Sequence, residues 1–266
     1  MDFSELSHQR EIRESLNKIF SEKCSPEKLK NFDNEFKHDE KLYEFLATNG
    51  YLGLGINEKL NGSGEDLYDL GILFECLGFH AAPLCLTGCL VDVAQTLQKF
   101  SKSDNHQSIV SSITKGEIYT SAILEPLNHD PENPNTTAVF DDDKIIINGS
   151  KYLSEISSLA KGILISASSN KGVILALVKT DNVKLTQLTS TANSPLFKVE
   201  LKNVSIEESD VVHEEGRGLE ALKYLLQINM VMRSYIALGV TNKMTSLIAS
   251  YTSEREQFGR VIGTFQ

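Results

Sequence analysis

The feature that most constrains the fold of this chain is a block of short β-branched runs between two segments of helical periodicity. The runs, which turns separate, lie at residues 118–124, 136–140, 144–148, 163–168, 173–179, 183–188 and 196–204. Residues 141–143 and 169–172 are typical of hairpin connections. Because no helical pattern intervenes, the block predicts an antiparallel β-barrel or sandwich at residues 117–212 and disfavours a doubly wound nucleotide-binding sheet.

Before this block, apolar residues recur at helical spacing over residues 3–113, for example at Ile12, Leu16 and Phe20. Local signals mark where the helices begin and end: Pro26 is placed to begin one helix and Gly50 to end another. We therefore expect residues 1–116 to form an N-terminal helical domain.

After the block, the helical period returns and continues over residues 219–257 without a proline, which corresponds to roughly 60 Å of helix. The helix needs partners on several sides, because its apolar residues lie on more than one face. These residues are Leu222, Leu226, Met230, Ile236, Leu238, Met244 and Leu247. We expect residues 213–266 to be the beginning of a C-terminal helical domain, truncated here, whose remaining faces another segment or subunit covers. The predicted fold class is an α+β multidomain protein.

Composition narrows the classes of function. The chain has 266 residues, of which 41% are hydrophobic and 23% charged, as in ordinary globular proteins. The net charge of -10, without a cluster of basic residues, disfavours a nucleic-acid surface. No signal peptide is recognisable, and no apolar stretch approaches the roughly 18 residues of a membrane span, so we expect a cytoplasmic protein.

The four cysteines, at positions 24, 76, 85 and 89, show no Cys-x-x-Cys spacing. The histidine near them, His80, is better interpreted as a helix-end residue than as a ligand. We therefore expect mostly buried, reduced thiols, with neither a disulfide framework nor a metal site.

Residues 251–266 contain many polar, aromatic and glycine residues that packing of a helix against a core does not explain. Arg255 and Gln257 are expected near the helix end, beside Phe258 and Gly259, because the apolar side of the helix is already used by Leu247, Ile248 and Tyr251. A guanidinium, an amide and an aromatic ring suit a pyrophosphate with an attached purine. The alternative is a polar helix end with a glycine cap.

The pattern Tyr-x-x-x-Arg-x-Gln-Phe-Gly-Arg-x-Ile-Gly-x-Phe-Gln over residues 251–266 resembles the signature of the acyl-CoA dehydrogenases. Residues 50–83, with Gly-Tyr-Leu-Gly-Leu-Gly-Ile and Glu-Cys-Leu-Gly-Phe-His-Ala-Ala-Pro, resemble the N-terminal domain of that family. The resemblance implies bound FAD, with Arg255, Gln257 and Phe258 as cofactor-binding residues and Arg255 reaching the pyrophosphate across a subunit interface. It also implies an acyl-CoA substrate, an electron-transfer flavoprotein as partner and a homo- or heterotetramer.

The start of the middle block resembles the flavin-facing strand and loop of the same family. Residues 124–130 read Leu-Glu-Pro-Leu-Asn-His-Asp, which implies flavin contacts from Glu125 and His129. Leu124 replaces the threonine of the family pattern, and His129 stands where the family has serine. After a register shift of one residue, Tyr152 or Ser154 could take the place of the family's flavin-contacting residues. For Ser154, the alternative is a solvated turn serine.

Arg233 follows Met232 in an apolar part of the long helix, where an unpaired charge would be costly, so it requires an anionic partner. The resemblance implies contact with acyl-CoA, and a structural ion pair is the alternative. Some family members place a catalytic glutamate where Met232 stands, and most others supply it from beyond residue 266. The catalytic residues are therefore unknown from the sequence.

The leading prediction is an FAD-dependent acyl-CoA dehydrogenase homologue that catalyses α,β-dehydrogenation of an acyl-CoA thioester. The alternative is a non-catalytic or half-site subunit that completes the flavin site of a partner. Substitutions at the family positions favour this alternative: Leu124, His129, Leu153 and Met232. A flavin-dependent monooxygenase of the same fold is a third possibility, which nothing in the sequence specifies.

Overall fold

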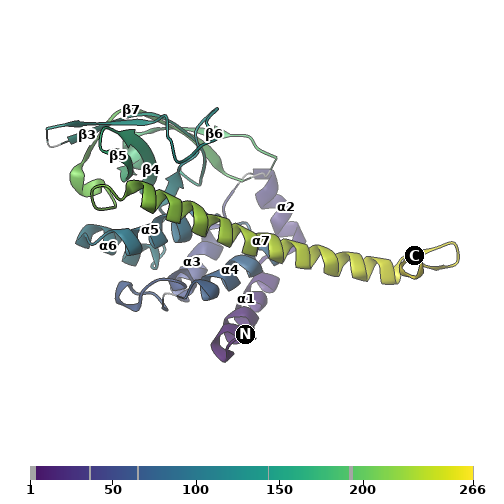
Figure 1. Cartoon of the computed structure of the whole chain (residues 1–266). Helices are drawn as coiled ribbons and strands as arrows, with labels where there is room; N and C mark the ends of the chain where they lie inside the picture. The colour runs from purple at the N-terminus through teal and green to yellow at the C-terminus, as the bar shows by residue number, and fades with distance from the viewer. Residues whose placement is uncertain (1–3, 36, 65, 143, 192–193, 266) are drawn as a thin grey trace.

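The computed structural model describes residues 4–35, 37–64, 66–142, 144–191 and 194–265. Figure 1 shows a layer of helices from the N-terminal part, a curled sheet above it, and one long helix, α7, that passes along both. The second half of α7 extends beyond the rest of the molecule and ends in a small hairpin. The arrangement confirms the predicted α+β fold.

Short helices make up the first layer: α1 (Ser7–Lys23), α2 (Pro26–Glu35), α3 (Glu40–Thr48), η1 (Tyr51–Gly53), η2 (Glu58–Leu60), α4 (Leu67–Phe79), α5 (Thr96–Phe100) and α6 (Asp104–Ile113). Their ends follow local chemistry. Pro26 begins α2, and Gly50, in the left-handed region at φ 79°, follows α3, as predicted. Asp66 caps α4, because its side chain accepts a hydrogen bond from the Tyr68 amide. His80 ends α4, also as predicted.

The segment before α5 is a π-helix, η3 (Thr87–Gln95), in which every residue is buried. π-Helical turns are rare and occur often at functional sites. Because η3 continues directly into α5, the wider turns of η3 determine which residues of the combined η3–α5 segment face the sheet and α7.

The strands are β1 (Thr120–Ala122), β2 (Thr137–Asp141), β3 (Lys144–Glu155), β4 (Gly162–Ser169), β5 (Gly172–Lys179), β6 (Lys184–Leu188) and β7 (Leu196–Glu207), with single turns η4 (Thr180–Asn182) and η5 (Glu208–Asp210). Each predicted run contains a strand, and the hairpins β2–β3 and β4–β5 form as expected, although Asp143 lies outside the described residues. The β3 strand is longer than predicted, because register shifts near Gly149 and after Lys151 bend it without ending it.

The seven-stranded sheet has the order β1-β4-β2-β3-β7-β6, with β5 paired to β4. The prediction of purely antiparallel pairing is wrong at β4, which lies parallel to β1 and to β2. The β4 strand lies between β1 and β2 in the sheet, although it follows the β2–β3 hairpin in the chain. The order of the strands therefore depends on long-range pairing, which the local pattern of β-branched residues and turns does not reveal.

The long helix α7 (Gly218–Glu254, 37 residues) ends three residues earlier than predicted. Its middle packs very closely on α4: a Cβ at Gly78 would lie 2.2 Å from the Ile236 carbonyl oxygen, and one at Gly239 would lie 2.0 Å from the Glu75 carbonyl oxygen. Only glycine at both positions allows this approach. The N-terminal part of α7 joins the main core through Leu222.

The part of α7 that lies beyond its contact with α4, from about Met244 onward, is largely exposed. Leu247, Ile248 and Tyr251 are 57%, 60% and 60% exposed, so the expectation that they line a used apolar side is wrong. Of the described elements, those that lie beside the end of α7 are the hairpin and the turn that follow it (Figure 1). After α7 the chain forms the hairpin β8 (Glu256–Gln257) and β9 (Arg260–Val261) and the turn η6 (Ile262–Thr264), and Gln266 lies outside the described residues.

The four cysteines are free thiols, three of them buried and Cys85 partly exposed, as expected. Of the helices that the structure describes, none has the length and hydropathy needed to cross a membrane.

Candidate functional site

The main candidate site is a cavity of about 360 Å³, the inner cavity, where η3, β1, β3 and the first half of α7 meet. It combines a polar cluster with an apolar ledge. Its lining residues are Asp92, Ser121, Ile123, Leu124, Tyr152, Leu153, Glu155, Ser194, Leu196, Leu225, Leu226, Asn229 and Arg233.

Asp92, from the π-helix η3, is the centre of the polar cluster. Its Oδ2 accepts a hydrogen bond from Ser121 Oγ at 2.5 Å, and its Oδ1 accepts one from Asn229 Nδ2 at 2.7 Å. The residue is 4% exposed. Three elements that are far apart in the chain thus converge on one buried carboxyl group.

Burial raises the pKa of Asp92 to about 7, although the hydrogen bonds from Ser121 and Asn229 act in the opposite direction. The Glu155 carboxylate also raises this pKa, and the Arg233 guanidinium lowers it. A carboxyl group with a pKa near neutrality can both take up and release a proton. Sequence reasoning missed Asp92. The signal was a single acidic residue inside the apolar run Leu-Val-Asp-Val-Ala.

Arg233 also lines the inner cavity and forms an ion pair with Glu155 of the same chain. Its Nη2 is 3.2 Å from Glu155 Oε1, and its Nε donates to Asn229 Oδ1 at 2.8 Å. The Arg233 side chain is nevertheless 55% exposed. The alternative of an ion pair is therefore observed, and the exposed guanidinium remains a proposed substrate contact. Met232 is fully buried in the main core.

The apolar ledge of the inner cavity consists of Leu124, which follows β1, and of Tyr152 and Leu153, which belong to β3. Leu124, Tyr152 and Leu153 are 45%, 36% and 44% exposed. Leu153 has a φ of 58°, a left-handed conformation that is uncommon for a leucine and costs free energy. The ledge is therefore an apolar surface that is in contact with water.

The polar residues that the resemblance assigned to flavin have other partners in this structure. Glu125 is 2.7 Å from the Nζ of Lys151, and its carboxylate also accepts bonds from the amides of Asn135 and Thr136. Burial opposes ionisation of Glu125, but these donors hold its pKa at about 2. Glu125 thereby ties down the loop between β1 and β2, rather than offering a free carboxylate.

His129 and Ser154 do not line the inner cavity. His129 is exposed in the loop between β1 and β2. Ser154 is 1% exposed, and its hydroxyl donates to the Ser121 carbonyl at 2.7 Å while it accepts a bond from Ser157 Oγ. The register shift between Lys151 and Ser154 directs this side chain inward. The expectation of a solvated turn serine is therefore wrong, and this hydroxyl is already used within the chain.

Arg255, Gln257 and Phe258 are exposed at the far end of α7, and the Phe258 side chain is 93% exposed. Phe258 and Gly259, at φ 54° and 75°, form the turn of the β8–β9 hairpin. Arg255 lies roughly 30 Å further along the helix axis than Arg233, at about 1.5 Å per residue. The structure therefore does not bring this group together with the inner cavity of the same chain.

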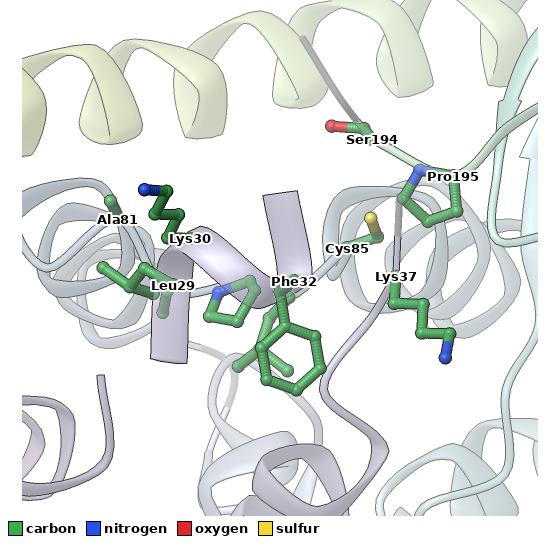
Figure 2. Close-up of a pocket in the computed structure, with 11 residues that line it drawn as sticks. Leu29, Lys30, Phe32, Lys37, Ala81, Cys85, Ser194 and Pro195 are labelled. Carbon is green, nitrogen blue, oxygen red and sulfur yellow. The ribbon is translucent and has the colours of Figure 1, made fainter. Parts of the chain in front are cut away.

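A second cavity, the outer cavity, adjoins the first, with Ser194 in the lining of both. It has a volume of about 500 Å³ and lies between α2, the segment after α4 and the Ser194–Pro195 segment. Figure 2 shows Cys85, Ser194 and Pro195 grouped below α7, with Lys30 and Lys37 on the side of α2. Burial, followed by the nearby Glu155 carboxylate, raises the pKa of Cys85, so this thiol is unreactive at neutral pH.

Comparisons with known proteins agree with this geometry. The family model for the acyl-CoA dehydrogenase N-terminal domain matches residues 7–117. Acyl-CoA dehydrogenase FadE28 of Mycobacterium tuberculosis is 23% identical over 84% of this chain and 63% of its own length. The probable acyl-CoA dehydrogenase YngJ of Bacillus subtilis is 23% identical over 100% of this chain and 74% of its own length.

Among solved structures, the ChsE4-ChsE5 complex from Mycobacterium tuberculosis matches with a TM-score of 0.91 and 23% identity, covering 100% of this chain and 72% of that one. The chain thus spans about two thirds to three quarters of the length of these proteins. Residues 7–117 thus match the N-terminal domain of the acyl-CoA dehydrogenases, relatives named as acyl-CoA dehydrogenases align with nearly the whole chain, and the chain has the fold of the matched complex.

Proposed function

We propose that this chain is a subunit of an FAD-dependent acyl-CoA dehydrogenase that binds the acyl part of a thioester in the inner cavity. The observation that carries the proposal is the combination of an apolar ledge and a buried polar cluster in the lining of one cavity. A flat cofactor and an acyl group between the ledge and the cluster would bring the substrate carbons next to polar side chains. The relatives named as acyl-CoA dehydrogenases support the same reaction class.

The residues of this chain have separable tasks in that reaction. Leu124, Tyr152 and Leu153 present the surface for the flavin ring, which when bound supplies the acceptor for the hydride. Arg233 offers guanidinium donors to the thioester carbonyl at the cavity. Glu125 and Lys151 hold the loop behind the ledge in place. An extended thioester that passes Ser194 contacts both cavities. The electron-transfer flavoprotein that the resemblance implies would then reoxidise the flavin.

A half-site subunit is the second candidate, and the position of Arg255 favours it. Arg255, Gln257 and Phe258 lie too far from the inner cavity of their own chain to contact a flavin that rests on its ledge. We propose that they bind the pyrophosphate of a flavin that a second subunit holds, with Arg255 supplying guanidinium donors. The matched ChsE4-ChsE5 structure is a complex named for two proteins, which supports assembly from unlike subunits.

Titration with FAD and acyl-CoA tests the proposal. The purified chain, alone and with any copurifying homologue, is titrated with FAD and then with octanoyl-CoA under anaerobic conditions. We expect bound flavin whose absorption near 450 nm changes on addition of the thioester. Flavin binding only in the presence of a homologue would favour the half-site subunit. Absence of both flavin and acyl-CoA binding in either sample would contradict the proposed function.

A further inference from the structure

Two carboxyl groups line the inner cavity, and their surroundings give them different chemistry. Glu155 is in a direct ion pair with Arg233, at 3.2 Å, so its negative charge is balanced. Among the residues that the structure describes, the side-chain donors to Asp92 are neutral, a hydroxyl and an amide. A buried carboxylate without a direct cationic partner is costly, because desolvation penalises its charge.

The position of Asp92 is built by several elements. The π-helix η3 carries it, β1 supplies Ser121 and α7 supplies Asn229. The amide of Asn229 is held in one orientation, because its Oδ1 accepts from Arg233 Nε while its Nδ2 donates to Asp92. Each oxygen of Asp92 accepts one of these bonds, and each has a second lone pair. One acceptor position per oxygen is therefore left for another hydrogen atom at the cavity wall.

We propose that Asp92 is the catalytic base of this chain, removing a proton from the carbon next to the carbonyl of a thioester bound in the inner cavity. The inference rests on the proposed function and supplies the base that the sequence did not reveal. Ser121 and Asn229 are positioning residues, which fix the carboxylate and moderate its basicity.

The step balances without an oxidant. The α C–H bond breaks, its proton goes to an oxygen of Asp92, and its electron pair stays on the substrate as an enolate whose charge lies mainly on the carbonyl oxygen. The Arg233 guanidinium at the same cavity offers donors to that oxygen. Return of a proton from Asp92 regenerates the thioester, so in D₂O the α position takes up deuterium even if no dehydrogenation occurs.

The groups that act on the charge of Asp92 come from each neighbouring element. Ser121 on β1 and Asn229 on α7 stabilise the carboxylate, as does Arg233 at longer range, whereas Glu155 on β3 opposes ionisation. Burial dominates and places the pKa near 7. Such a group is ionised in part at neutral pH and basic enough to accept a proton, as general-base catalysis requires.

The test uses phenylacetyl-CoA, which has acidic α hydrogens and no β hydrogen, so it exchanges but cannot be dehydrogenated. Its Kd is measured by calorimetry, and its deuterium uptake in D₂O by NMR, for the purified chain with FAD and any copurifying homologue. We expect enzyme-catalysed uptake that Asp92→Asn reduces by about 10²- to 10⁴-fold with little change in Kd. Asp69→Asn, which alters a buried aspartate on α4 outside the inner cavity, should leave uptake unchanged.

A pH profile separates a base from a structural aspartate and remains informative if Asp92→Asn fails to fold. The uptake rate of the unmodified chain should rise with pH through a midpoint near 7. Ser121→Ala removes a bond to the charged carboxylate, so the midpoint should move to higher pH. Binding without uptake, or a midpoint that Ser121→Ala does not move, would overturn the role of Asp92 and leave the proposed function intact. Absence of thioester binding in the unmodified chain would contradict both.

Discussion

The side-chain amide of Asn229 donates a 2.7 Å hydrogen bond to the carboxyl group of Asp92, joining two residues that are 137 positions apart in the chain. This contact connects the N-terminal helical region to α7 at the wall of the inner cavity. It also links Asp92 indirectly to Arg233, which bonds the other side of the same amide. The polar cluster exists only when both parts of the chain are folded together.

The first prediction concerns stability as a function of pH. The pKa of Asp92 is raised from 3.8 to about 7, so between these values the folded state binds more protons than the unfolded state. The contribution of Asp92 to the free energy of unfolding therefore falls as pH rises through this window. Asp92→Asn removes this loss, and the variant should gain as much as about 4 kcal/mol relative to the unmodified chain between pH 4 and pH 8. Urea unfolding of both proteins at several pH values measures the difference, and parallel curves would contradict the prediction.

The second prediction concerns the buried pair of Glu125 and Lys151. Lys151→Met should destabilise the protein by about 3–5 kcal/mol, because it leaves the Glu125 carboxylate buried without its cation. Adding Glu125→Gln should recover much of the loss, since no uncompensated charge then remains. Thermal unfolding of both single variants and the double variant gives the coupling energy. Additive effects of the two substitutions would show that the pair does not act as a unit.

The third prediction concerns the crossing of α4 and α7. Helix propensity alone favours alanine over glycine by about 1 kcal/mol. Gly239→Ala should nevertheless destabilise the protein by about 1–3 kcal/mol, because its Cβ would meet the Glu75 carbonyl oxygen at 2.0 Å and separate the helices. Ser246→Ala on the exposed half of α7 is the matched control, and its effect should be small or stabilising. A stabilising Gly239→Ala would mean that the two helices are not held at this distance.

The fourth prediction concerns the flavin pyrophosphate. Arg255→Lys keeps the charge but loses the bidentate fork, so the FAD affinity of the assembled protein should fall by about tenfold to a hundredfold. Arg10→Lys, on the exposed surface of α1, makes the same chemical change elsewhere and should have no effect. Weakening that requires a partner would favour the half-site subunit. An unchanged Kd in every sample would remove the cofactor role assigned to Arg255.

The fifth prediction concerns assembly. The apolar residues on the protruding half of α7, among them Met244, Leu247 and Ile248, are more than half exposed. We expect the chain to associate with itself or with a homologue through this surface, and Ile248→Glu to weaken that association. Light scattering measures the mass of each species. Thr245→Glu, which places the same charge at an already polar position of the helix, is the control. A monomer that binds FAD with full affinity would refute the expected assembly.

Much of this protein could be predicted from the sequence, because the determining interactions are local. Period and turn chemistry located each strand of the seven-stranded sheet, although not β8 and β9. Pro26 and Gly50 marked helix boundaries, and the absence of proline predicted the long helix. The family resemblance came from short contiguous motifs at residues 50–83, 124–130 and 251–266. Each of these signals lies within a few residues of the feature that it predicts, so reading them requires no knowledge of the fold.

The candidate site depended on tertiary structure. Ser121 and Asp92 are 29 positions apart, and Asn229 is further still, so no local pattern could show that they share a hydrogen-bonded cluster. The inward direction of Ser154 follows from a register shift in β3, which depends on pairing with β7. The chemistry of Asp92 depends on desolvation by neighbours from separate elements, a property that an aspartate acquires only when the folded chain removes it from water.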